Sequence, residues 1–336
     1  MKIIIKLSVV FLGLIISCTN NDPNGIQTSD TELILMSLLD EDDAIGMDGF
    51  GSDGDMDIEH EIGLESEESL GRSLSDTLQY GEGYRIRFGR RISERERSVE
   101  FEVNGDTAIG SVTYNISGEF IVRAIDTTNF ELIDSLGFNK QFSSYFYRNI
   151  RFVKVDDVSN PDGYRWKIDA LTPLTGGTGD KVQILNISIY SLDSLFQVSE
   201  LLYSFDINES GQLYMNRDNL LRYTAFSRIL ILAEVSNNEP EFTMDSSEVG
   251  ERVFVNYGRN NMQRGRRSLQ DYGLFFDQTA NDNIHSGGIR VHGPGPGQAR
   301  GIFRTFFETI DLATLYISDG GYNTSVWSIP YVVERQ

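Results

Sequence analysis

Residues 108–122 read Ala-Ile-Gly-Ser-Val-Thr-Tyr-Asn-Ile-Ser-Gly-Glu-Phe-Ile-Val. The even-numbered positions carry Ala, Gly, Val, Tyr, Ile, Gly, Phe and Val, whereas the odd-numbered positions are mostly polar. An alternation of this length predicts a long β-strand with one buried face. Gly110 and Gly118 predict bends or bulges within that strand.

Neighbouring segments extend this pattern into an antiparallel sheet. The sequence predicts a turn at Gly105-Asp106 and further strands at 148–155 and 164–171, joined through Asn160-Pro161-Asp162-Gly163, a strong hairpin signal. A short helix is predicted at 32–39, capped by Ser29 or Asp30. Residues 31–172, which include a very acidic N-terminal segment, are therefore expected to form a small α+β domain with a curved sheet.

This predicted domain resembles the NTF2-like cone fold. The residues that carry the resemblance are 108–118, 151–155 (Arg-Phe-Val-Lys-Val) and 163–168 (Gly-Tyr-Arg-Trp-Lys-Ile), the last of which looks like the strand that closes such cones. Many members of that family are enzymes or small-molecule binders with a pocket inside the cone. The conceivable lining residues of such a pocket are Tyr114, Arg151, Trp166 and Asp169.

A second domain is predicted after residues 173–180, Pro-Leu-Thr-Gly-Gly-Thr-Gly-Asp, which resemble a linker in composition. Short strands separated by turn residues follow, and this spacing predicts a β-sandwich over 181–336. The predicted strands are Val182–Tyr190, Leu201–Asp206, Gln212–Met215, Phe226–Val235, Val253–Tyr257, Gly288–His292, Phe303–Phe307 and Val326–Val333. The whole chain is therefore expected to be mainly β.

The loop at 269–286 carries a motif of its own. Leu-Gln-Asp-Tyr-Gly at 269–273 continues to Asp277 and then to Asn-Asp-Asn-Ile-His-Ser at 281–286. This resembles a pattern in bacterial immunoglobulin-like domains of exported proteins: an Asp-Asp-Gly turn, a second Asp, and an Asp-Gly before a β-branched residue and an aromatic. Asn283 and His285 stand where Gly and Tyr are usual. The resemblance implies an immunoglobulin-like sandwich for 181–336 and says nothing about catalysis.

Three carboxylates, those of Asp271, Asp277 and Asp282, fall within this one loop. They are expected to form Asx-turns, whose side chains accept local backbone N–H bonds. The alternative is a calcium site, because calcium prefers oxygen ligands at such spacing.

Two other clusters have weaker functional interpretations. His285 and His292, with Asp282 and Arg290 near them in sequence, allow a metal or catalytic site, although loop histidines more often have no such role. The basic stretch 264–267 is either a solvated loop or a contact for the acidic N-terminal region or an anionic glycan.

The first residues of the chain predict where the protein goes. Lys2 and Lys6 precede an apolar run at 7–16. This run is shorter than the roughly 20 residues that a membrane-spanning helix needs, and its length suits a signal peptide. Ile-Ile-Ser-Cys at 15–18 resembles the bacterial lipobox. The resemblance implies that residues 1–17 are removed, that Cys18 receives fatty acyl chains such as palmitate, and that 18–30 form a flexible tether. An ordinary signal peptide with a coincidental cysteine is the alternative, but lipidation accounts for the only cysteine of the chain.

The charge of the chain narrows its partners. Its formal net charge is −21, and residues 19–71 contain 16 acidic residues and no Lys or Arg. Such a protein repels nucleic acid. The expected partners are the membrane, through the lipid, and a cell-envelope protein or glycan. The expected location is the outer membrane of the cell envelope, and the sequence does not decide between its periplasmic and its outer face.

Two functions remain open at this point. The first is a non-catalytic binding or accessory module, because Gly-x-Ser-x-Gly, His-Glu-x-x-His and a catalytic cysteine are all absent from the sequence. The alternative is a hydrolase or isomerase that uses a pocket inside the cone. Apart from possible calcium, no cofactor is expected.

Overall fold

A computed structural model describes the chain from the predicted helix to near its C-terminal end, with gaps. The described residues are 29–47, 50, 52–53, 60–62, 84–126, 129, 131–179, 181–209, 211–243, 249–259 and 265–335. Cys18, the predicted signal peptide and most of the predicted tether lie outside them. The described chain is mainly β, which confirms the predicted class. No helix within the described ranges combines the length and apolarity that crossing a membrane would require.

The larger sheet runs in the order β1-β3-β4-β5-β7-β17-β16-β13-β14. Its path consists of β1 (Ser52–Asp53), β3 (Tyr84–Asn104), β4 (Thr107–Asp126), β5 (Leu132–Asp156), β7 (Leu174–Gly177), β17 (Thr324–Glu334), β16 (Arg300–Asp311), β13 (Glu251–Arg259) and β14 (Gly265–Leu269). Four strands attach to it off this path: β2 (His60–Ile62), β6 (Tyr164–Leu171), β10 (Met215–Asn216) and β11 (Leu221–Thr224).

The predicted strand at 108–122 is the middle of β4, which pairs with β3 and β5 along almost its whole length. Its predicted inner face is buried, including Val112, Ile116 and Phe120, each 0% exposed. The predicted bulge is also present, because the register with β3 shifts between Ile92 and Glu94, opposite Gly118. A Cβ atom at Gly118 would lie 2.0 Å from the carbonyl oxygen of Arg91, so only glycine fits there.

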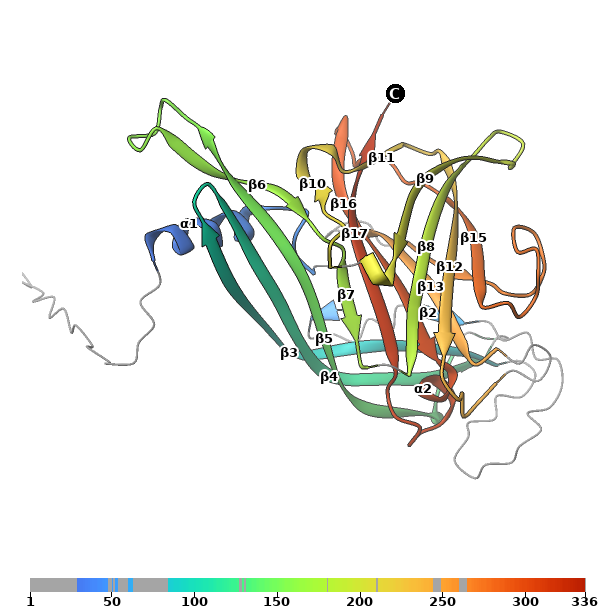
Figure 1. Ribbon diagram of the computed structural model, residues 1–336. Helices are drawn as coiled ribbons and strands as arrows, with labels where there is room; N and C mark the ends of the chain where they lie inside the picture. The colour runs from blue at the N-terminus through green and yellow to red at the C-terminus, as the bar shows by residue number, and fades with distance from the viewer. Residues whose placement is uncertain are drawn as a thin grey trace, which may run out of the picture.

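The sheet continues through the segment that was predicted to be a linker. Leu174–Gly177 forms β7, which pairs with β5 on one edge and with β17 on the other. The linker prediction is therefore wrong for these residues, and the sheet crosses the predicted domain boundary without interruption (Figure 1).

A second, smaller sheet lies against the C-terminal half of the first. Its order is β15-β12-β8-β9, formed by β15 (Ile284–Arg290), β12 (Arg228–Asn237), β8 (Val182–Leu192) and β9 (Val198–Asp206). All of its pairings are antiparallel. The strand bounds in this half agree with most of the strands predicted from the sequence. Strands β14 and β11 and the short helix α2 (Leu312–Tyr316) were not predicted.

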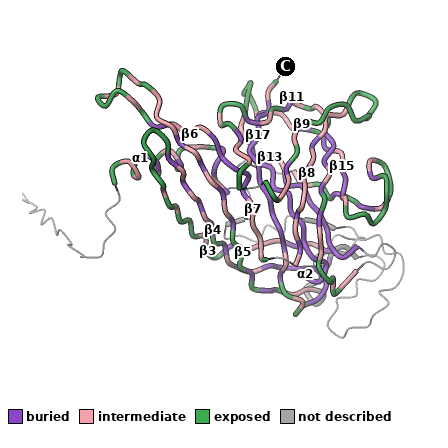
Figure 2. The backbone as a smooth tube through the Cα atoms, viewed as in Figure 1, coloured by how far each residue is buried: buried purple, intermediate pink, exposed green. Residues whose placement is uncertain are grey.

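The two sheets bury the middle strands on both faces. Every residue of β17 except Glu334 is buried, and β16 is buried from Phe303 onward. Figure 2 shows this as a continuous buried colour through the centre, with exposed residues at the loops. A strand covered on one face only would alternate between buried and exposed residues, so this pattern places β16 and β17 in the centre of the molecule.

The first half of the sheet curves until it meets the second half again. Phe88 of β3 lies 5.6 Å, between ring centroids, from Phe254 of β13. Lys140 of β5 donates to the carbonyl oxygens of Ala313 (3.2 Å) and Gly321 (2.7 Å), beside α2. The buried apolar residues of both halves form one cluster, so one core supports the described molecule.

Candidate functional site

The residues expected to line a cone pocket are engaged in the packing of the molecule. Tyr114 and Trp166 are 4% and 5% exposed and belong to the core cluster. Asp169 accepts a hydrogen bond of 2.7 Å from Nε of Arg151, and both side chains are partly open to solvent. The structure therefore places an ion pair and two core aromatics at these positions.

The structure brings the three aspartates of the loop at 269–286 close together. One carboxylate oxygen from each of Asp271, Asp277 and Asp282 lies within 4.8 Å of the other two. Burial raises the pKa of Asp271, while the nearby His285 lowers it. A separation of this size fits a calcium ion as well as a set of turns.

Backbone N–H groups already bind these carboxylates. Asp271 accepts from the N–H groups of Asn283 (2.9 Å) and Asp282 (3.4 Å), and Asp282 itself accepts from Ile284 (3.0 Å). Asp277 accepts from Gly273 and from Thr279 (3.3 Å). These are the contacts that the Asx-turn interpretation predicts.

The two histidines of this region lie apart. His285, at the start of β15, has Nε2 3.0 Å from a carboxylate oxygen of Glu251, and both side chains are buried. His292 lies beyond the other end of β15, with Nε2 2.6 Å from the hydroxyl oxygen of Tyr331. Seven residues at about 3.3 Å each separate the histidines by roughly 20 Å. The idea of one site containing both histidines is therefore wrong.

His292 borders a small cavity between the two sheets. Its volume is about 20 Å³, enough for about one water molecule, and its walls are mainly apolar, with Ile189, Val255 and Phe307 among them. Burial lowers the pKa of His292, so its imidazole is neutral at pH 7. A cavity of this size is too small for an organic ligand.

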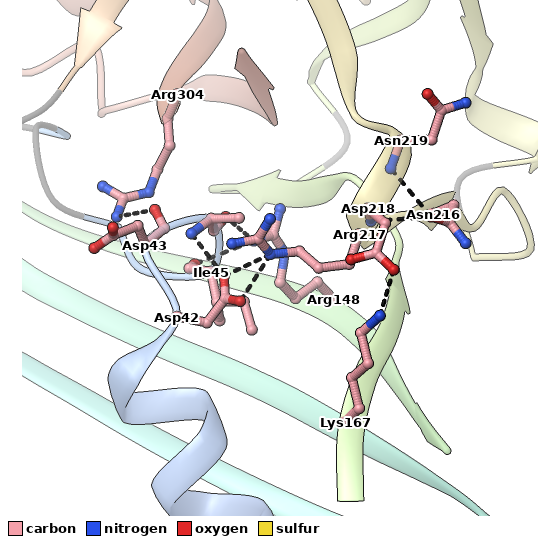
Figure 3. A network of polar contacts seen from close by, with 11 residues as sticks. Asp42, Asp43, Ile45, Arg148, Lys167, Asn216, Arg217, Asp218, Asn219 and Arg304 are labelled. Atoms are coloured by element: carbon pink, nitrogen blue, oxygen red, sulfur yellow. Dashed lines mark hydrogen bonds and ion pairs between the residues drawn. The ribbon is translucent and has the colours of Figure 1, made fainter. Parts of the chain in front are cut away.

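Three arginines hold the segment that follows helix α1 (Asp30–Glu41). Arg148 of β5 donates to the carbonyl oxygen of Ile45 (3.1 Å), and Arg304 of β16 donates to that of Asp43 (2.8 Å). Arg217 donates to the carboxylate of Asp42 (2.7 Å) (Figure 3). Arg148 is 1% exposed, and burial lowers its pKa to about 10.

Apolar residues insert beside these arginines. Ala44, Ile45, Met47 and Phe50 are all buried, and the ring of Phe50 lies 5.1 Å from that of Phe146 and 5.5 Å from that of Phe306. The arginine cluster therefore anchors the N-terminal segment in the core. Its contacts are structural.

A different kind of surface lies at the end of the smaller sheet where β8 turns into β9. Phe196 and Phe226 are 53% and 56% exposed, and both have left-handed backbone angles, with φ of 62° and 66°. The guanidinium carbon of Arg228 lies 4.0 Å from the ring centroid of Phe196, and that of Arg290 lies 5.4 Å from that of Phe226. We call these four residues the arginine–phenylalanine patch.

The structure assembles the arginine–phenylalanine patch from two loops, which carry Phe196 and Phe226, and two strands, β12 and β15. Arg228 and Arg290 are paired directly across β12 and β15. Further exposed apolar side chains lie on or beside β9, namely Leu195, Val198 and Leu201. Neither arginine forms an ion pair with a described residue, and both are exposed.

The patch was missed in the sequence because its members are far apart and individually ordinary. The sequence shows only that Phe196 and Phe226 lie near predicted turns. Their exposure, which marks them as unusual, is visible only in the fold. The basic stretch that the sequence did highlight is divided: Arg264 lies outside the described residues, Arg266 packs on the ring of Phe254 (3.8 Å), and Arg267 is exposed.

Comparisons with known proteins give no further guidance to the site. No protein-family model, curated protein or solved structure matches this chain.

Proposed function

We propose that this chain is an exported, lipid-anchored protein of the bacterial cell envelope, and that its smaller sheet is a non-catalytic binding module. The observation that carries the proposal is the arginine–phenylalanine patch. Two half-exposed phenylalanines in left-handed backbone conformations are unfavourable for a free protein, because each conformation costs about 1–2 kcal/mol. Phe275 shares this exposure and backbone, so the distinguishing feature of Phe196 and Phe226 is the exposed arginine beside each ring. Arginine and aromatic side chains together are typical of contact sites for a partner.

The proposed anchor rests on the sequence. Lys2, Lys6 and the apolar run before Cys18 agree with a lipoprotein signal peptide. The described fold begins at Ser29, whose side chain and that of Glu32 form a capping box at the start of α1. About ten residues therefore lie between the proposed lipid and the folded part, which is enough for a tether.

We also propose the finer fold relationships as hypotheses. The two facing sheets formed after residue 181 agree with an immunoglobulin-like sandwich, and the curved sheet of β3, β4 and β5 beside α1 agrees with a cone-like fold. The enzyme alternative receives less support, because the described residues expected to line the cone are packed or ion-paired.

Binding to isolated envelopes of the source bacterium tests the proposed function. The protein is residues 18–336 with Cys18→Ser, so that no lipid contributes to binding. We expect it to co-sediment with the envelopes, and the double variant Phe196→Ser/Phe226→Ser to lose at least half of that binding. The matched control is Phe275→Ser, which removes another exposed phenylalanine outside the patch. Equal sedimentation of the double variant and the control would refute the proposal, provided that both variants melt like the parent.

A further inference from the structure

The charges of the arginine–phenylalanine patch are not balanced within the described molecule. Arg228 and Arg290 face each other directly across two antiparallel strands, an arrangement in which like charges destabilise the sheet. The chain has 50 acidic residues and 29 basic ones, so acidic partners are plentiful. Nevertheless, neither arginine is ion-paired to any part of the chain that the structure describes. An anionic partner from outside would balance both charges.

The loops that carry the phenylalanines are held by local hydrogen bonds. One oxygen of Asp193 accepts from the N–H groups of Leu195 and Gln197, both at 2.8 Å, which fixes the turn around Phe196. Phe226 donates its N–H to the carbonyl oxygen of Val291 (3.1 Å), beside Arg290. A ligand would therefore meet side chains already in place, which lowers the entropic cost of binding.

Arginine and phenylalanine side by side favour a ligand with both an anionic and an apolar surface. A guanidinium binds a carboxylate through two parallel hydrogen bonds. The face of an aromatic ring packs against C–H groups, as the flat face of a sugar provides. Sugars that carry carboxylates combine these two surfaces. A nucleic acid also presents both surfaces, but the sugar separates its phosphates from its flat bases. Each guanidinium here lies beside its own phenylalanine ring, which suits a carboxylate and an apolar face on the same sugar.

The position of the patch argues against the anchoring membrane as its ligand. Helix α1, which follows the proposed tether, lies at one side of the molecule, and the smaller sheet lies at the other (Figure 1). The patch is at the β8–β9 end of that sheet. It is therefore available to material beyond the membrane surface.

From these observations we infer that the arginine–phenylalanine patch binds an acidic polysaccharide, one whose sugars carry carboxylates. This inference rests on the proposed function and names the ligand class of the same module. Each arginine pairs with a carboxylate, and each phenylalanine packs against the sugar beside it.

Calorimetric titration with polygalacturonate tests the ligand class, using residues 18–336 with Cys18→Ser. The comparison ligands are the same polymer with its carboxylates reduced to alcohols and vesicles of phosphatidylglycerol. We expect binding to polygalacturonate only. We expect Arg228→Gln/Arg290→Gln to weaken it about tenfold or more, which corresponds to a combined loss of at least about 1.4 kcal/mol from the two charged contacts. Arg228→Lys/Arg290→Lys retains the charge but not the paired hydrogen bonds, and we expect it to weaken binding as well.

The control is Arg267→Gln, which removes one positive charge from an exposed arginine outside the patch. We expect it to bind like the parent. Equal loss in this variant, equal binding of the reduced polymer, or binding to vesicles alone would overturn the inference. Absent polygalacturonate binding, together with patch-dependent binding to envelopes, would refute the ligand class and leave the proposed function standing. Failure of both experiments would refute both.

Discussion

Phe275 allows the left-handed backbone of the exposed phenylalanines to be tested alone. It lies in a turn closed by a hydrogen bond from the N–H of Asp277 to the carbonyl oxygen of Leu274 (3.2 Å), and its φ is 61°. A positive φ at the first central position of a turn is usual for glycine. Phe275 is also 95% exposed, so its replacement removes almost no buried surface.

Substitution of Phe275 by Gly and by Ala should separate the two variants in stability. The left-handed conformation costs Ala about 1–2 kcal/mol, whereas Gly loses about 0.5–1 kcal/mol more conformational entropy on folding. The Gly variant should therefore be more stable than the Ala variant by up to about 1.5 kcal/mol, with about 0.7 kcal/mol as the central value. In a chain of this size that corresponds to roughly 2 °C in melting temperature.

Urea unfolding followed by circular dichroism, supported by calorimetry, measures this difference. Leu274 is the matched control, because it precedes Phe275 and has no positive φ. There the order should reverse, with Leu274→Gly less stable than Leu274→Ala by about 0.5–1 kcal/mol. An Ala variant at 275 that is more stable than the Gly variant by about 0.5–1 kcal/mol, as expected at Leu274, would show that the left-handed conformation is not occupied in solution.

Four other outcomes are expected. Asp277→Asn should lower the melting temperature equally with calcium and with chelator, because its carboxylate serves a turn; a calcium-dependent loss would establish a metal site. Burial lowers the pKa of Lys140 to about 8 from 10.5, so between these pH values the folded state binds fewer protons than the unfolded state. The free energy of unfolding should therefore rise from pH 8 to about 10.5, relative to that of Lys140→Met. Parallel pH profiles of the two proteins would contradict this. Limited proteolysis should spare Gly176, which lies within β7, and rapid cutting there would argue against the strand. Cys18→Ala should abolish incorporation of a fatty-acid probe, and a labelled variant would exclude this anchor.

The sequence predicted strands well where one face is buried. In β4 the alternation of apolar and polar residues reflects a local property, so residues 108–122 were sufficient. The segment at 174–177 was wrongly predicted because its glycines look like a linker. A Cβ atom at Gly176 would lie 2.0 Å from the carbonyl oxygen of Tyr145, and one at Gly177 would lie 2.0 Å from that of Thr324. These glycines allow neighbouring strands to approach closely. The need for glycine is therefore visible only once the distant strands that contain Tyr145 and Thr324 are in place.

The candidate site was less accessible from the sequence. Asp271, Asp277 and Asp282 were noticed because they share one loop, and the structure places their carboxylates close together. The choice between turns and calcium stays a prediction. The members of the arginine–phenylalanine patch are separated by up to 94 positions, from Phe196 to Arg290. The register of β12 with β15 brings the arginines together, and long-range pairing of this kind is not encoded in a local pattern.

The central position of β17 also has a consequence for how the protein is made. Its pairing partners β7, β11 and β16 all precede it in the chain. Until Thr324–Glu334 has been synthesised, β7 and β16 have no strand between them, and the apolar residues that Trp327 covers face water. Such late, non-local closure slows folding and prolongs the exposure of unpaired edges. For a chain proposed to cross a membrane before it folds, this late closure would help to keep the chain unfolded during the crossing.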